Sequence, residues 1–119
     1  MSLQMACRLL EDIEPVEIEY EKGKVTKSFL RKVLELVDKY ETKEEYILSI
    51  AYMVARNKKY EEDDIVTFYR RLKNLIKELD DDWKNKLKEI MQNVVKLYYV
   101  KLDTATRDLL EEGVICMKE

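Results

Sequence analysis

Apolar side chains return every three or four positions through most of the chain. The ranges 27–40, 63–79 and 83–102 show this spacing most regularly, so one side of each segment is apolar and the other is charged. Thr26 or Ser28 can cap the first segment, because a side-chain oxygen at a helix start accepts a backbone N–H group. The pattern predicts three long amphipathic helices over these ranges.

The segment 43–59 differs because it is apolar on nearly all sides. A capping box marks its start, since Thr42 is followed three residues later by Glu45. Apolar side chains then fill most positions of 46–55. A helix that is apolar all round must be covered all round. We therefore expect this helix at the centre of a bundle or against a partner subunit.

Residues 1–25 have no sustained helical periodicity. Residues 16–20 alternate between apolar and acidic side chains, which is the periodicity of a strand. We expect an irregular N-terminal arm here, either extended or folded as a hairpin, with no more than a short helical turn before Pro15.

Beyond residue 102 the pattern predicts a short helix and a tail. The helix is expected over 105–112, and Gly113 suits the position that follows a helix end. Residues 114–117 form a short apolar run. A strand that pairs with residues 16–20 is one interpretation of it, and the sequence leaves this open.

Length and composition fit a single globular domain. The chain has 119 residues, of which 46% are hydrophobic and 39% charged, with only two Gly and one Pro. We expect an all-α fold, a compact bundle of four to five helices, with an arm at 1–25, the bundle at 26–112 and a tail at 113–119. The sequence has neither a signal-peptide pattern nor an apolar run of about 20 residues, so we expect a cytoplasmic protein.

No catalytic or cofactor-binding arrangement is recognisable. The chain contains no His, the commonest general base, and its two glycines form no phosphate-binding loop. The acidic clusters at 61–64 and 80–82 lie where helix starts favour negative charge, which accounts for them without a metal ion. We expect a protein that is not an enzyme and that binds neither a cofactor nor a metal.

Cys7 and Cys116 lie near opposite ends of the chain. Without His and without a CxxC spacing they do not suggest a zinc site. A disulfide that ties the ends together is one option. We favour two independent thiols, because a reducing cytosol keeps cysteines reduced.

Basic side chains gather in two segments although the whole chain is acidic. The net charge is −3, yet residues 26–60 and 83–102 contain more Lys and Arg than Asp and Glu. A local basic surface attracts nucleic acid whatever the total charge. The candidate RNA contacts are Arg31, Arg56, Lys58, Lys59, Arg70, Arg71, Lys96 and Tyr99. The plain alternative is a set of solvated helix surfaces without a ligand.

An up-and-down four-helix arrangement predicts where some of these groups meet. In such a bundle the ends of the second and fourth helices lie at the same pole. We therefore expect the basic residues of 56–59 to lie near Lys96 and Lys101.

Four short segments carry patterns shared with a known family: VTKSFLRKVLELV (25–37), AYMVARNKK (51–59), FYRRLKNLIKEL (68–79) and MQNVVKLYY (91–99). Together they resemble the small helical subunit of type III-A CRISPR effector complexes. Arg31 and Arg56 match arginines of that family, whereas the stretch 91–96 and the tail beyond Asp103 depart from it. The resemblance implies a non-catalytic, RNA-binding subunit of an antiviral ribonucleoprotein complex. Such subunits repeat along a guide RNA–target RNA duplex and contact its backbone through basic side chains.

Two other interpretations stay open. The segments 68–79 and 94–114 are also similar to the helical domain of archaeal GINS subunits, which implies a role in DNA replication. The third interpretation is a structural homodimer without a nucleic-acid role, or more generally a homo-oligomer that associates through the apolar helix at 43–59. Abundant Lys and Glu with few Asn and Gln are typical of a thermophilic source.

Overall fold

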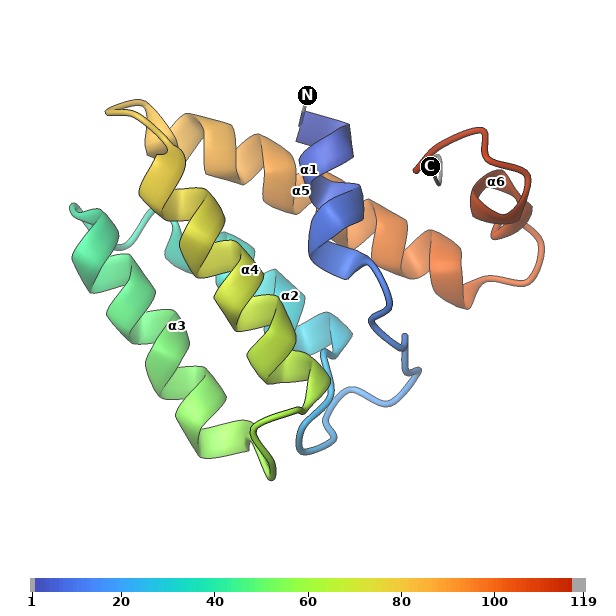
Figure 1. Cartoon of the computed structure of the whole chain (residues 1–119), viewed down its shortest axis with the longest axis horizontal. Coiled ribbons are helices and arrows are strands. Elements are labelled where there is room, and N and C mark those ends of the chain that lie inside the picture. Colours follow the sequence, from blue (N-terminus) through green and yellow to red (C-terminus); the bar gives the residue numbers. More distant parts are fainter. Residues whose placement is uncertain (1, 117–119) are drawn as a thin grey trace.

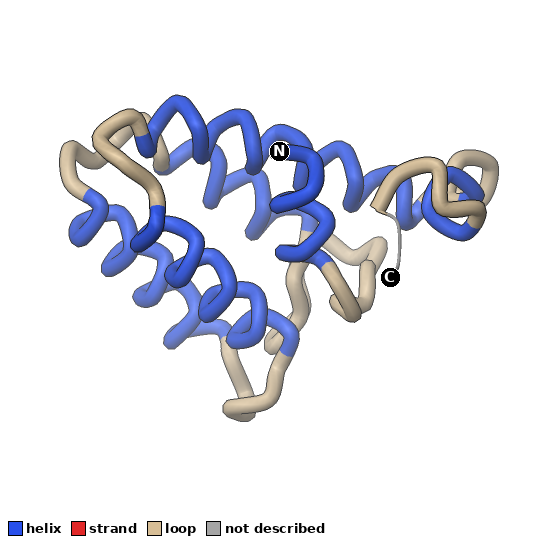
Figure 2. Tube along the Cα trace, turned by 45° about the horizontal axis from the view of Figure 1, so that its top comes forward, coloured by secondary structure: helices blue, strands red, loops and turns tan. Residues whose placement is uncertain are grey.

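The computed structural model describes residues 2–116, which fold into six α-helices (Figure 1). The helices are α1 (Ser2–Leu10), α2 (Lys27–Leu36), α3 (Lys43–Asn57), α4 (Asp64–Glu78), α5 (Trp83–Leu102) and α6 (Asp108–Glu111). No strand occurs in this part of the chain (Figure 2), and none of its helices is long and apolar enough to cross a membrane. The all-α prediction is confirmed, with one helix more than the expected four to five.

The helix starts use the capping residues that the sequence indicates. The N–H of Phe29 donates to Thr26 Oγ1 at 3.2 Å, so Thr26 rather than Ser28 caps α2. At the start of α3, the N–H of Glu45 donates to Thr42 Oγ1 at 3.1 Å, as the capping box predicts. These local hydrogen bonds fix where two of the helices begin.

The predicted helices appear with small changes of length. The helix predicted over 83–102 has these bounds in the structure, as α5. Gly113 adopts a φ of +72°, a left-handed conformation that suits a residue just past a helix end. The other four helices are shorter than predicted and lie within 27–40, 43–59, 63–79 and 105–112.

The core is a single apolar cluster, to which α5 contributes the most buried side chains. α1 and α2 pack against α5, and α3 packs mainly against α4, which also contacts α1 (Figure 1). α5 is 20 residues long and crosses the bundle, so it can meet several neighbours. Its buried side chains are Trp83, Leu87, Ile90, Met91, Val94, Leu97 and Tyr98.

The prediction of an irregular arm over residues 1–25 is wrong for its first part, which forms α1. Ala6, Leu9 and Leu10 are buried against the core, at the spacing of one helix side. A helix of nine residues is marginal by itself in water. Its stability comes from packing against α5, which local periodicity does not reveal.

The expected central position of the second predicted helix is also wrong, because α3 lies at the edge of the bundle. Only Tyr46, Ile50 and Val54 of α3 are buried. On the opposite side, Leu48 is 70% exposed and Tyr52 is 60% exposed. α3 therefore covers the core with one side only, and α5 contributes more buried side chains than any other helix of residues 2–116.

Residues 16–20 and 114–116 form no strands, and Met117 lies outside the described residues. The loop before α2 is held by a buried side chain instead. Tyr98 Oη donates to the carbonyl oxygen of Val25 at 2.6 Å and accepts the N–H of Val16 at 2.8 Å. Burial raises the pKa of Tyr98, so its hydroxyl stays protonated and keeps these hydrogen bonds at neutral pH.

The favoured interpretation of two independent thiols is wrong, because Cys7 and Cys116 form a disulfide. Their Cα atoms lie 5.4 Å apart, although 109 positions separate them in the sequence. Figure 1 shows the reason, since the chain after α6 turns back toward α1. The unpredicted α1 is therefore the element that brings Cys7 within reach of Cys116.

Candidate nucleic-acid interface

The eight predicted RNA contacts divide into three groups in the structure. The first group lies on neighbouring surfaces of α2 and α5. The second extends from the end of α3 through the turn into α4, and the third is one further arginine of α4. In this order the groups are Arg31, Lys96 and Tyr99; then Arg56, Lys58, Lys59 and Arg70; then Arg71.

α2 and α5 lie side by side and run in opposite directions. Just before α2, the carbonyl oxygen of Val25 accepts a hydrogen bond from Tyr98, near the end of α5. Just after α2, Asp38 pairs with Lys88, near the start of α5. Residues early in α2 therefore face residues late in α5.

This arrangement brings an aromatic ring and three basic groups together. Lys27 Nζ lies 5.4 Å from the centroid of the Tyr99 ring, within the range of a cation–π contact. Arg31 follows Lys27 by one turn of α2, and Lys96 precedes Tyr99 by about one turn of α5. We call Lys27, Arg31, Lys96 and Tyr99 the α2–α5 patch.

Sequence reasoning missed Lys27 as a member of this patch. A signal was present, because Lys27 lies four residues before Arg31 and so falls on the same side of the helix. Its contact with Tyr99 depends on the packing of two helices that are more than 45 residues apart in sequence, which the local pattern does not contain.

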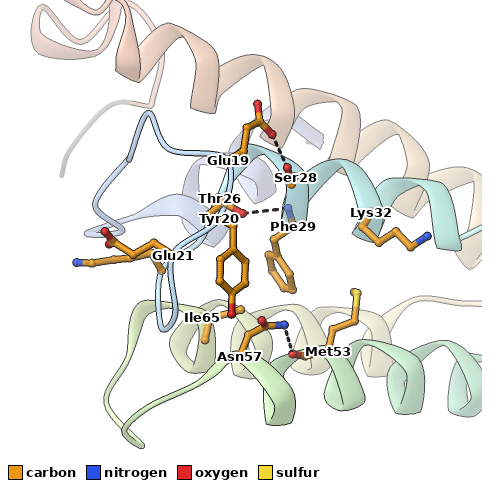
Figure 3. Close-up of a pocket in the computed structure, with 11 residues that line it drawn as sticks. Glu19, Tyr20, Glu21, Thr26, Ser28, Phe29, Lys32, Met53, Asn57 and Ile65 are labelled. Carbon is orange, nitrogen blue, oxygen red and sulfur yellow. Dashed lines mark hydrogen bonds between the residues drawn. The ribbon is translucent and has the colours of Figure 1, made fainter.

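One carboxylate of the preceding loop reaches the patch. Glu19 Oε2 accepts a hydrogen bond from Arg31 Nη2 at 2.9 Å. It also accepts one from the Ser28 hydroxyl (Figure 3). The bond from Ser28, with the charges of Arg31 and Lys27, holds the pKa of Glu19 below its usual value. Glu19 is therefore ionised at neutral pH, and a phosphate would have to replace it at Arg31.

The second group lies at the turn between α3 and α4, and acidic residues offset its charge. Glu61 pairs with Lys58 at 3.4 Å and with Arg70 at 3.6 Å. The guanidinium carbon of Arg56 lies 5.3 Å from the centroid of the Tyr52 ring. We call Arg56, Lys58, Lys59 and Arg70 the α3–α4 turn.

The expected approach of residues 56–59 to Lys96 and Lys101 is wrong. Figure 1 shows α3 ending at the bottom of the view and α5 ending at the right. Lys101 Nζ donates to the carbonyl oxygen of Leu10 at 3.0 Å, at the end of α1. The helices do not form an up-and-down bundle, because α5 crosses the molecule while α3 stays at its edge.

Arg71 has a structural position at the end of α1. Its Nη1 donates to the carbonyl oxygens of Arg8, Leu9 and Glu11, at 3.2, 3.3 and 2.6 Å. The last carbonyl groups of a helix lack partners within the helix, and a cation near this end also favours the helix dipole. Arg71 therefore fastens α1 to α4.

We expect Arg71→Ala to lower the free energy of unfolding by about 2–3 kcal/mol, because charge-assisted hydrogen bonds to otherwise unpaired carbonyls are lost. The matched control is Arg70→Ala, which removes the neighbouring arginine but only an exposed ion pair, worth about 0–1 kcal/mol. Urea denaturation measures both. Equal losses for the two variants would contradict the capping role of Arg71.

A groove of about 370 Å³ opens beside the patch, between the loop before α2 and the helices α2 and α3 (Figure 3). Phe29, Met53 and Ile65 supply apolar lining, and the exposed Tyr20 lines the groove as well. The Asn57 amide in the wall is already engaged, because it donates to a backbone carbonyl at 2.6 Å. Glu19 and Ser28, which are hydrogen-bonded to each other, also line the groove, so its wall is part apolar and part polar.

The described residues contain no group of three or more His, Cys, Asp or Glu that could hold a metal ion. Asp63, in one of the acidic clusters, accepts the N–H groups of Lys59 and Tyr60 at 2.6 and 2.8 Å. These two hydrogen bonds hold the pKa of Asp63 below its usual value. This carboxylate therefore organises the turn before α4.

Comparison with protein-family models, with curated proteins and with solved structures finds no match for this chain. The resemblances to the CRISPR small subunit and to the GINS helical domain stay expectations from the sequence.

Proposed function

We propose that this chain is a non-catalytic protein that binds single-stranded RNA at the α2–α5 patch, as a small subunit of a ribonucleoprotein complex. The observation that carries the proposal is the contact of Lys27 with the Tyr99 ring, with Arg31 and Lys96 about one turn away. Proteins that bind single strands combine aromatic rings, on which bases stack, with cations that follow the phosphates.

Stacking of an RNA base on Tyr99 is strong enough to replace the contact that Lys27 makes with this ring in the free protein. Tyr99 is 41% exposed, so a base can reach its ring. An exposed cation–π contact is worth about 0.5–1 kcal/mol, whereas stacking a base on an aromatic ring is worth about 1–3 kcal/mol. A base that stacks on Tyr99 can therefore displace Lys27, whose ammonium group then pairs with a phosphate.

The ion pair at the edge of the patch is also weak enough to open. Arg31 and Glu19 have side chains that are 50% and 59% exposed. Such exposed pairs contribute about 0–1 kcal/mol. A phosphate binds Arg with two parallel hydrogen bonds, so it can replace Glu19 at Arg31. Because the Arg31–Glu19 ion pair has to break first, one copy of the protein binds RNA with low affinity.

The resemblance to the CRISPR small subunit supports a role within a larger complex. A single patch with three cations releases few counterions, so one copy alone binds RNA weakly. Copies repeated along one RNA raise the effective concentration of each patch. The proposed assembly therefore explains how a weak, sequence-tolerant site could serve a stable complex.

Two charge-matched triple variants test the location of the site. We expect Lys27→Ala/Arg31→Ala/Lys96→Ala to lower the affinity for single-stranded RNA about tenfold or more at low salt. The salt dependence should also nearly vanish, because the slope of log K against log salt is about −2 for three phosphates on a single strand. Fluorescence anisotropy with a labelled oligouridine measures both quantities.

The control for this experiment is Arg56→Ala/Lys59→Ala/Arg70→Ala. It also removes three positive charges but leaves the α2–α5 patch intact, so we expect less than about a twofold change. A larger loss in the control than in the first variant would place the site at the α3–α4 turn. Tighter binding of single-stranded DNA of matching sequence would favour the DNA-replication interpretation.

A further inference from the structure

The outer side of α3 carries a charge pattern that is complementary to itself. Leu48 and Tyr52, 70% and 60% exposed, form its apolar middle. Glu44 is exposed one turn before Leu48, and Arg56 is exposed one turn after Tyr52. The order along this side is therefore acidic, apolar, apolar and basic, at a regular spacing of four residues.

Such an order matches a second copy of itself when the two helices run antiparallel. About a twofold axis, residue i of one helix faces residue j of the other, with a constant sum of i and j. If the axis passes at the height of Ile50, Leu48 meets Tyr52 of the second copy. The same axis places Glu44 opposite Arg56 of the second copy, so all four residues gain a partner at once.

The position of Ile50 agrees with this axis. The twofold axis runs between the two helices, so it passes α3 on the side opposite Ile50. That side must be free of other helices of the same chain. Ile50 is 1% exposed and points into the core, so the opposite side of α3 faces outward at the required height. Ala55, which is also exposed, provides room for close approach of a second helix beside Tyr52.

We propose that the outer side of α3 pairs with the same side of a second copy of this chain, antiparallel and about a twofold axis. One helix side offers less than the roughly 800 Å² per partner of a standard stable interface. The pair is therefore a dimer that dissociates on dilution. This contact leaves the α2–α5 patch uncovered, so it is independent of RNA binding.

Charge reversal at both ends of the pattern tests the pairing. In the twofold pair, Glu44→Arg alone faces Arg56 of the second copy, and Arg56→Glu alone faces Glu44 of the second copy, so each places like charges together twice. The double variant Glu44→Arg/Arg56→Glu restores opposite charges at both contacts. Self-association should therefore be lost in each single variant and recovered in the double variant.

Analytical ultracentrifugation from about 10 µM to about 1 mM covers the weak affinities expected here, with circular dichroism to verify that every variant is folded. A concentration-dependent dimer in the parent chain and in the double variant, but not in the single variants, is the expected result. A parent chain that stays monomeric overturns the proposal. Single variants that dimerise like the parent, or a folded double variant that stays monomeric, overturn it as well.

Discussion

Loss of the Cys7–Cys116 disulfide is expected to lower the free energy of unfolding by about 3–5 kcal/mol. The bridge joins residues 109 positions apart, so it closes nearly the whole chain into one loop. In the unfolded state such a large loop removes much conformational freedom, and the stabilisation grows with loop length. The bridge also fastens the segment after α5, whose helix α6 has no buried side chain.

Urea denaturation with and without a thiol reductant measures this effect. The control is the double variant Cys7→Ser/Cys116→Ser, which should be as unstable as the reduced parent and should not respond to reductant. A reduced parent chain with unchanged stability would show that the bridge contributes nothing to folding.

The disulfide bears on where the protein works. Disulfides persist mainly outside the cytosol, but intracellular proteins of hyperthermophiles are a known exception. The cytoplasmic location expected from the sequence is compatible with the bridge only in such a cell.

Tyr99→Ala is expected to lower the affinity for single-stranded RNA about ten- to hundredfold, because one stacked base contributes about 1–3 kcal/mol. Tyr99 is at the surface, so its loss should leave the core and the fold unchanged. Tyr99→Phe keeps the ring and should retain most of the affinity. Anisotropy titration with a labelled oligouridine measures all three proteins.

The control for Tyr99 is Tyr60→Ala, which removes a tyrosine that is 63% exposed beside the α3–α4 turn. Its affinity for RNA should equal that of the parent. If Tyr60→Ala binds RNA more weakly than Tyr99→Ala does, the α3–α4 turn rather than the α2–α5 patch is the stacking site.

Sequence was sufficient where structure depends on neighbours along the chain. The capping groups Thr26 and Thr42 act on residues three positions away, so their patterns are visible as short motifs. The bounds of α5 follow from one long amphipathic period that is framed by acidic residues. Helix α1 is too short for its period to be recognised, and its stability depends on packing against α5, which begins more than 70 residues later.

The candidate site was harder to predict, because it depends on which helices meet. Arg31, Lys96 and Tyr99 were identified separately, and only the antiparallel packing of α2 on α5 joins them and adds Lys27. Arg71 has the charge of an RNA contact, but its partners are the carbonyl groups at the end of α1. Composition and periodicity do not tell these two uses of an arginine apart.

A nuclear magnetic resonance titration of the ¹⁵N-labelled chain with a short single-stranded RNA tests the proposed RNA site most directly. We expect the largest shifts in the amide signals at the α2–α5 patch, at Lys27, Arg31, Lys96 and Tyr99. The signals of the α3–α4 turn should change little. Shifts centred on that turn, or no shifts at RNA concentrations in large excess, would contradict the proposed RNA-binding function.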